Sequence, residues 1–294
     1  MRNFLKTSFL LILISSFVFC KQSTQAQKKT PERNLDQEFK DYWYQGSAEI
    51  STYELSENRY GELREGKASL IYVTEDFVPN KQVKADHFNA NNIPVLKLNS
   101  VKKFITGIYP YSIMQSSFLP LNKEEHAIKV TTSVQEWCGQ TFIQLNNKDQ
   151  FEINAFSYFE RESDHQLKLE KNYTENELWN LIRLQGLKSL PVGEVNLIPS
   201  FEYIRLSHRE IKAYPAKIAS TIENGLVNYT IQYPDFNRTL TINFQENAPY
   251  IIESWSDQTD NKEPSTAKRI TTKQLPYWGL NSKKDQILRD ELGL

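Results

Sequence analysis

The chain has 294 residues, a formal net charge of −1 at pH 7, and 12% aromatic residues. Its 35 basic and 36 acidic residues are interspersed and form no basic stripe, so nucleic-acid partners, which need clustered phosphate contacts, are disfavoured. Cys20 and Cys138 are too few thiols for a disulfide framework, and we expect a hydrophobic core to stabilise the fold.

The first twenty residues have the layout of an export signal. Arg2 and Lys6 precede an apolar run over residues 9–19, broken only by two serines. A membrane-spanning helix needs about 20 apolar residues, and this run ends sooner, at the polar sequence KQSTQAQKK. The run is therefore predicted to be a targeting segment rather than a transmembrane span.

Two processing routes are consistent with this segment. In the first, residues 1–19 are removed and lipoprotein maturation attaches a diacylglycerol to Cys20; in the second, ordinary signal peptidase cuts after Ala26. The first route is favoured, because a cysteine so close behind an export segment is rare by chance. It implies a cell-envelope lipoprotein anchored to the outer membrane, with the periplasmic face favoured, whereas the second implies a soluble periplasmic or secreted protein.

Composition divides the chain into four expected regions. They are a signal peptide at 1–19, a flexible tether at 20–40, a single β-rich domain at 41–256, and a polar tail with a short C-terminal helix at 257–294. The tether is rich in Lys and Gln and nearly devoid of apolar residues, which is typical of flexible segments. Order is expected to begin near Tyr42 and Trp43, where large rings first become available for burial.

Alternation of apolar and polar residues dominates the central region and is typical of antiparallel strands. Phe151, Ile153 and Ala155, for example, alternate with polar residues, so one face of that strand can be buried. Strands are predicted at Ala48 to Leu55, Gly66 to Thr74, Val95 to Ile105, Ser112 to Leu119, Ala127 to Glu136, Gln140 to Leu145 and Gln150 to Phe159.

A helix and a four-strand meander follow these strands. Thr174 and Glu177 have the spacing of a capping box, and a helix with an apolar stripe is predicted from there to Gly186. Between Ala213 and Ser256 the turn residues, beginning with Asn224-Gly225, predict three hairpins.

The predicted fold class is therefore mainly β (β-rich α+β). We expect a curled antiparallel sheet or half-barrel with one packed helix and a short C-terminal helix begun by Ser282.

Three segments, DYWYQGSAEISTYELSENRYGELREGKASLIYVTEDF, GIYPYSIMQSSF and SVQEWCGQTFIQLN, resemble an uncharacterised family of envelope lipoproteins from Bacteroidota-type bacteria. Some members carry the label "septum formation inhibitor Maf", taken from cytoplasmic nucleotide pyrophosphatases. Those enzymes resemble a compact α/β fold with a Ser- and Arg-rich phosphate-gripping segment at the extreme N-terminus. This chain has an export signal there, so the resemblance implies an envelope lipoprotein and no pyrophosphatase chemistry.

Candidate catalytic groups are weakly supported. Cys138 stands beside Gly139 and suggests a cysteine hydrolase, but activated thiolates often lie at helix N-termini, whereas this one falls in or between strands. It is expected to be buried and unreactive. The histidines have no metal-binding spacing and are expected to be solvated loop residues. They are His87, His126, His165 and His208. No catalytic residue, metal site or cofactor is predicted.

Aromatic residues are the richest feature of the sequence. They can stack on sugars, line an apolar pocket, or contact a membrane surface, although core packing in strands accounts for most of them. The candidate ligand contacts are Trp43, Tyr109, Tyr111 and Trp137. Pro110 is expected to hold its two tyrosines in a strand-breaking turn with their rings at a rim.

These observations favour a non-catalytic, membrane-tethered envelope lipoprotein. Its expected partners are the membrane through the lipid anchor, a lipid or other apolar ligand, and other envelope proteins for which it acts as an adaptor. A fold-level likeness to half-barrel lipoproteins that hold acyl chains favours the lipid ligand. The alternatives are a periplasmic or surface hydrolase of envelope or imported polymers, and a carbohydrate-binding protein.

Overall fold

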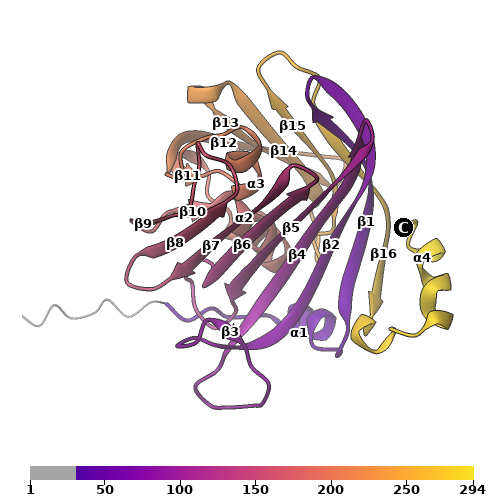
Figure 1. The fold of residues 1–294 in the computed structure, drawn as a ribbon. Coiled ribbons are helices and arrows are strands. Elements are labelled where there is room, and N and C mark those ends of the chain that lie inside the picture. Colours follow the sequence, from indigo (N-terminus) through magenta and orange to yellow (C-terminus); the bar gives the residue numbers. More distant parts are fainter. Residues whose placement is uncertain (1–30) are drawn as a thin grey trace, which may run out of the picture. The chain divides into compact units, whose positions relative to one another are not determined.

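In the computed structural model, strands make up most of the described residues, which are 31–294 (Figure 1). The predicted signal peptide at 1–19, the lipidation site Cys20 and the alternative cut after Ala26 lie outside the described residues. So does the first half of the expected tether. Among residues 31–294, no helix is long and apolar enough to span a bilayer.

The strands form one sheet that curls on itself without closing, which confirms the predicted fold class (Figure 1). In chain order they are β1 (Ala48–Arg59), β2 (Glu62–Val78), β3 (Val83–Lys84), β4 (Ile93–Thr106), β5 (Tyr109–Pro120), β6 (Lys129–Glu136), β7 (Gly139–Asn147), β8 (Phe151–Ser157), β9 (His165–Leu169), β10 (Tyr173–Thr174), β11 (Gly193–Ile198), β12 (Tyr214–Glu223), β13 (Leu226–Tyr233), β14 (Arg238–Gln245), β15 (Ile252–Thr259) and β16 (Ser265–Leu275).

The sheet consists of two meanders that meet at β1 and β16. The N-terminal wing runs from β1 to β9 and the C-terminal wing from β10 to β16, and β3 pairs only with β2. Within each wing the hydrogen-bonded neighbours follow one another along the chain. The wings are joined where β1 pairs antiparallel with β16, with Ala48 opposite Leu275. The two ends of the sheet, β9 and β10, are not paired with each other.

The structure differs from the expected polar tail. Residues 257–275 complete β15 and form β16, a strand between β15 and β1, so the expectation is wrong up to Leu275. The segment has few apolar residues because only Ser265 and Ala267 of β16 are buried. The short C-terminal helix begun by Ser282 is confirmed and consists of the 3₁₀ turn η4 (Lys283–Ile287) and α4 (Leu288–Glu291).

The expected tether is also shorter than predicted. Helix α1 (Gln37–Trp43) begins within it, and the backbone N–H of Phe39 donates to the Asp36 carboxylate at 2.8 Å, which caps the helix. Phe39 and Trp43 are buried on the main core. Two apolar rings four residues apart therefore anchor a segment whose composition is otherwise polar.

Helix α2 (Glu175–Gln185) confirms the predicted capping box. The Thr174 hydroxyl accepts from the backbone N–H of Glu177, and the Glu177 carboxylate accepts from the backbone N–H of Thr174. Leu178, Leu181 and Ile182 are buried in the core as expected. A second inner helix, α3 (Phe201–Leu206), was not predicted and lies with α2 inside the curl of the sheet (Figure 1).

The predicted meander in the C-terminal wing is confirmed. Asn224 and Gly225 both have positive φ between β12 and β13, as a type I′ turn requires. The second hairpin turns through the 3₁₀ segment η2 (Pro234–Phe236). Two further 3₁₀ turns are η1 (Gly186–Ser189) and η3 (Tyr277–Gly279). The rings of the meander's inner face fill the curl against α2.

Candidate functional site

A cleft lies inside the curl, between the two inner helices and the strands of both wings. Its volume is about 570 Å³, which is within the range of small-molecule sites. The walls come from β1, β4 and β5 of the N-terminal wing, from α2 and α3, and from β14, β15 and β16. Two groups of buried charges contribute carboxylates to these walls.

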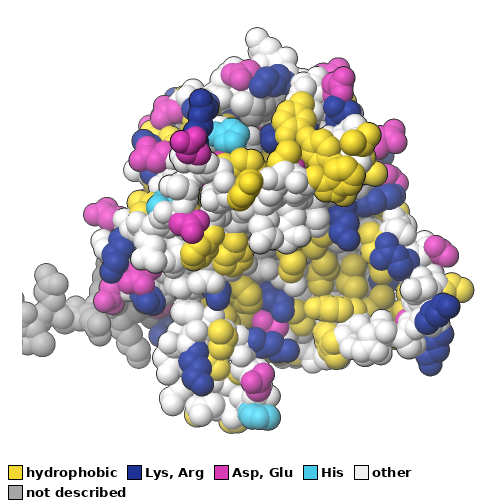
Figure 2. All heavy atoms as spheres, in the orientation of Figure 1, with side chains coloured by type: hydrophobic (Ala, Val, Ile, Leu, Met, Phe, Trp, Pro, Cys, Tyr) yellow, Lys and Arg dark blue, Asp and Glu magenta, His cyan; other side chains and the backbone are white. Residues whose placement is uncertain are grey.

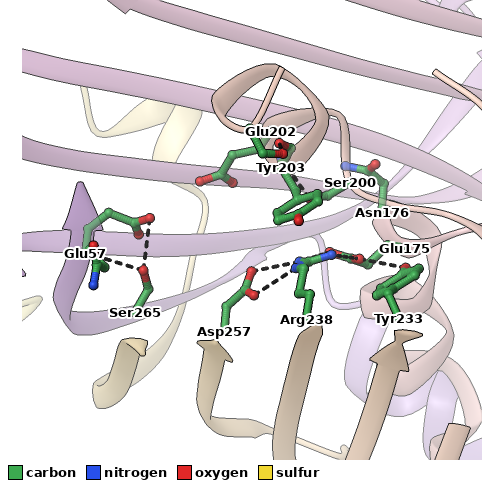
Figure 3. Close-up of polar contacts among 12 residues, drawn as sticks. Glu57, Glu175, Asn176, Ser200, Glu202, Tyr203, Tyr233, Arg238, Asp257 and Ser265 are labelled. Carbon is green, nitrogen blue, oxygen red and sulfur yellow. Dashed lines mark hydrogen bonds and ion pairs between the residues drawn. The ribbon is translucent and has the colours of Figure 1, made fainter. Parts of the chain in front are cut away.

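The first group is centred on Arg238 of β14 (Figure 3). Its guanidinium donates to both oxygens of Glu175 at 2.7 and 2.9 Å, and to both oxygens of Asp257 at 2.8 and 2.7 Å. The Tyr233 hydroxyl donates to Glu175 at 2.9 Å, and the ring of Tyr203 lies 3.9 Å from the guanidinium carbon. Burial alone would lower the pKa of Arg238, but the carboxylates of Asp257 and Glu175 raise it.

The second group is centred on Lys102 of β4. Its Nζ lies 2.8 Å from Glu202 and 3.4 Å from Glu57. The Gln115 amide donates to the other oxygen of Glu202 at 2.7 Å. The Ser265 hydroxyl donates to Glu57 at 3.2 Å, as Figure 3 shows. Burial raises the pKa of the Glu57 carboxyl above its ordinary range, and Lys102 opposes that shift only in part.

Polar side chains fix the helices against the sheet beside these groups. The Asn176 amide of α2 donates to the Gln115 side-chain oxygen at 2.8 Å, and the Asn176 oxygen accepts from the backbone N–H of Phe201 at 3.3 Å. Ser200 caps α3 by accepting from the backbone N–H of Tyr203. One hydrogen-bonded network therefore connects α2, β5 and the start of α3, and it points Glu175 and Glu202 into the cleft.

Carboxylates outnumber cations in the two groups. Glu57, Glu202, Glu175 and Asp257 make four, against the two cations Lys102 and Arg238. A carboxylate only accepts hydrogen bonds, and it offers about four acceptor positions. The walls therefore have unfilled acceptor capacity and an excess of negative charge. The partly buried ring of Trp179 supplies an apolar surface beside them.

The predicted ligand-contact aromatics do not line this cleft. Trp43 and Tyr111 are buried in the core, Tyr109 is half-buried, and Trp137 is 68% exposed. The structure brings Tyr109 and Trp137 together at 6.2 Å between ring centres, but Trp43 lies apart from them in α1.

The expected turn at Pro110 is wrong. Pro110 lies in β5 and pairs with Ile105 of β4. Pairing of β5 with β6 begins only at Ser112, so β6 does not reach Pro110. Its missing N–H therefore leaves no ladder hydrogen bond unmade.

Cys138 is exposed in the turn between β6 and β7, so the expectation of a buried thiol is wrong. The carboxylate of Glu136 raises the pKa of this thiol, which is the opposite of what a cysteine nucleophile needs.

The histidines are not all solvated. His126 is partly buried and its Nδ1 lies 2.8 Å from the buried Glu177 carboxylate. Among residues 31–294, no three His, Cys, Asp or Glu side chains are grouped as metal ligands.

The cleft residues were missed because carboxylates cannot be paired from sequence. One sequence feature did indicate the site. Every second residue from Arg238 is apolar (Leu240, Ile242 and Phe244), and all four side chains lie on the buried face of β14. An arginine at a core position predicts a buried ion pair. Glu57 is likewise in phase with Tyr53 and Leu55 on β1.

Comparisons with known proteins give no assignment. No family model matches the chain, and no curated protein matches it. Among solved structures, it is similar to a β-barrel-like protein of a domain of unknown function, DUF1849, from Brucella abortus. The identity is 8%, the TM-score is 0.47, and the match covers 77% of this chain and 97% of that one.

Proposed function

We propose that the chain is a non-catalytic binding protein whose cleft holds a compact polar ligand that bears hydroxyl and ammonium donors. The observation that carries this proposal is the set of four buried or half-buried carboxylates around two cations in the cleft walls. Donors on a ligand would fill the acceptor positions that these carboxylates leave open, and a positive charge would balance their excess.

The same walls disfavour an acyl chain. Filling the cleft with hydrocarbon would remove water from Glu57, Glu202 and Asp257 without replacing its hydrogen bonds, which is costly for charged groups. We therefore propose a polar ligand in place of the apolar one that the sequence favoured. The ring of Trp179 fits the apolar face of a sugar-like ligand.

We further propose that a lipid on Cys20 tethers the protein to the cell envelope, where it can also act as an adaptor. The support is the position of Cys20 directly behind the apolar export segment. Mass spectrometry of the protein purified from its own membranes tests this proposal. A diacylglycerol mass on Cys20 is expected, whereas a mature chain that begins at Gln27 would show that the tether is wrong.

Calorimetric titration with glucosamine and glucose tests the ligand class, because glucosamine carries an ammonium group in place of the 2-hydroxyl of glucose. Glucosamine is expected to bind more tightly. Glu57→Gln is expected to weaken its binding about tenfold or more, the value of a hydrogen bond to a charged group. Glu54→Gln is the matched control, since Glu54 lies on the exposed face of the same strand. Equal binding of both sugars, or binding of laurate instead, would refute the proposal.

A hydrolase is the second candidate, and one observation favours it. Two carboxylates, Glu57 and Glu202, lie on the same Lys102 ammonium in the cleft, and burial raises the pKa of Glu57, as acid–base catalysis by a carboxyl pair requires of the acid. Turnover of nitrophenyl glycosides that Glu57→Gln abolishes would establish this activity in place of simple binding.

A further inference from the structure

Four successive connections at one end of the N-terminal wing each expose a large apolar side chain. They lie between β1 and β2, β4 and β5, β6 and β7, and β8 and β9, and antiparallel pairing places them at the same end. The side chains are Tyr60, Ile108, Trp137 and Tyr158, which are 61%, 83%, 68% and 78% exposed. We call these four residues the apolar rim.

Contacts between neighbouring hairpins make the rim continuous. The Tyr60 hydroxyl hydrogen-bonds that of Tyr111 at 2.7 Å, and the Tyr109 ring lies 6.2 Å from that of Trp137. The Tyr158 ring packs against Gly139, where an added Cβ would come within 2.9 Å of it. The hairpins that carry Tyr60, Trp137 and Tyr158 are thus each packed against a neighbouring hairpin.

The apolar surface continues onto the outer face just behind the rim. Ile105 is exposed there, and Phe142 and Phe156 form an exposed cross-strand pair. Figure 2 shows hydrophobic side chains gathered at the upper right, where Figure 1 places the ends of the β1–β2 and β4–β5 hairpins. By contrast, the hairpin at the opposite end between β7 and β8 turns through the polar residues 148–150.

We propose that the apolar rim docks on a lipid bilayer, with the hairpin tips inserted among the headgroups. The rim residues lie at hairpin tips, which can insert into a deformable surface such as the headgroup layer. Tyr60, Trp137 and Tyr158 are ring types enriched at membrane–water interfaces, and Ile108 supplies an aliphatic tip that has no role in stacking on sugars. Exposed apolar surface of this kind marks an interaction site.

Charge near the rim indicates how docking proceeds. Exposed charges of both signs flank it, with Lys103 and Arg161 opposing Glu62 and Glu160. Binding therefore depends on apolar insertion rather than on attraction to anionic lipid, and it persists at high salt. This surface is separate from the cleft, and its docking does not depend on the ligand proposed there.

The N-terminal connection enters at the other end of the sheet. Glu32 pairs with Lys123, which lies in the connection between β5 and β6, opposite the rim. A lipid on Cys20 would by itself hold the protein on a membrane and would mask any binding through the rim. The test therefore uses the chain that begins at Gln27, which is the mature start in the second processing route and lacks both Cys20 and the apolar run over residues 9–19.

Flotation with phosphatidylcholine vesicles at low and high salt measures the partition coefficient. Ile108→Ser is expected to lower it about tenfold, from the apolar area that no longer inserts. Phe88→Ser is the matched control, because Phe88 is 87% exposed but lies in the β3–β4 connection at the opposite end, and it should leave partition unchanged.

Fluorescence quenching by brominated phosphatidylcholine gives an independent measurement. Trp137→Phe is expected to remove the quenching, whereas Trp278→Phe, at an exposed tryptophan of the C-terminal segment, should retain it. Equal partition of the Ile108 and Phe88 variants would overturn the proposal. So would binding to purified peptidoglycan that needs Trp137 but not Ile108, or a dimer in solution that Ile108→Ser dissociates.

Discussion

Replacing Arg238 with methionine tests the interpretation of the buried network most directly. Methionine retains the apolar stem against Tyr203 and Tyr233 but removes the charge that both carboxylates bind. The side chains of Arg238 and Glu175 are 1% and 3% exposed, so Glu175 would be left buried and unpaired. Breaking such a pair costs about 3–5 kcal/mol, which predicts a fall in melting temperature of about 10 °C.

Urea unfolding followed by tryptophan fluorescence measures this loss. Arg269→Met is the matched control, because Arg269 makes a similar bidentate pair with Glu253 in which both side chains are about one quarter exposed. That loss should stay below about 1 kcal/mol. Adding Glu175→Gln to Arg238→Met should recover about 2 kcal/mol, since the uncompensated charge is gone. Equal losses for the two arginine variants, or strict additivity in the double variant, would refute the reasoning.

Three further predictions concern local features. Burial alone would lower the pKa of His126, but Glu177 raises it above the ordinary 6.5. The stabilisation from the His126–Glu177 pair is therefore present below about pH 6.5 and is lost as pH rises through the folded-state pKa of His126. Unfolding free energies measured from pH 5 to 9 should therefore vary less with pH in His126→Gln than in the wild type. Thr174→Ala should cost about 1 kcal/mol in urea unfolding by removing the cap of α2, and no loss would show that the cap is dispensable. Gly225→Ala should cost about 1 kcal/mol because its φ is +75°, whereas Gly279→Ala, at a position without positive φ, should be neutral in the same assay.

Local signals in the sequence were sufficient for most of the fold. The capping box at Thr174 and the Asn224-Gly225 turn each contain the side chains that satisfy their own backbone geometry, so they predict structure without knowledge of distant partners. Strand β16 was missed because it is largely polar and one of its two partners, β1, lies more than two hundred residues away in the chain. Its place in the sheet depends on tertiary pairing rather than on an alternation of apolar and polar residues in its own sequence.

The candidate site was less accessible to prediction than the fold. Lys102 of β4 pairs with Glu57 on β1, two strands away in the sheet, and with Glu202 on α3. Each of these residues looks like a solvated charge when read alone. Only their position on the same face of the strand or helix as buried neighbours distinguishes them from surface residues. The aromatic clusters were conspicuous in the sequence, but Trp43 and Tyr111 serve the core.

The junction of β1 with β16 has a consequence for biosynthesis. Contacts within each wing are local and can form as the chain emerges, but β1 acquires its second neighbour only when residues 265–275 have arrived. Until then β1 is an open edge of the N-terminal wing that invites pairing with another chain. The growing polypeptide is therefore most prone to pairing with another chain just before β16 is delivered.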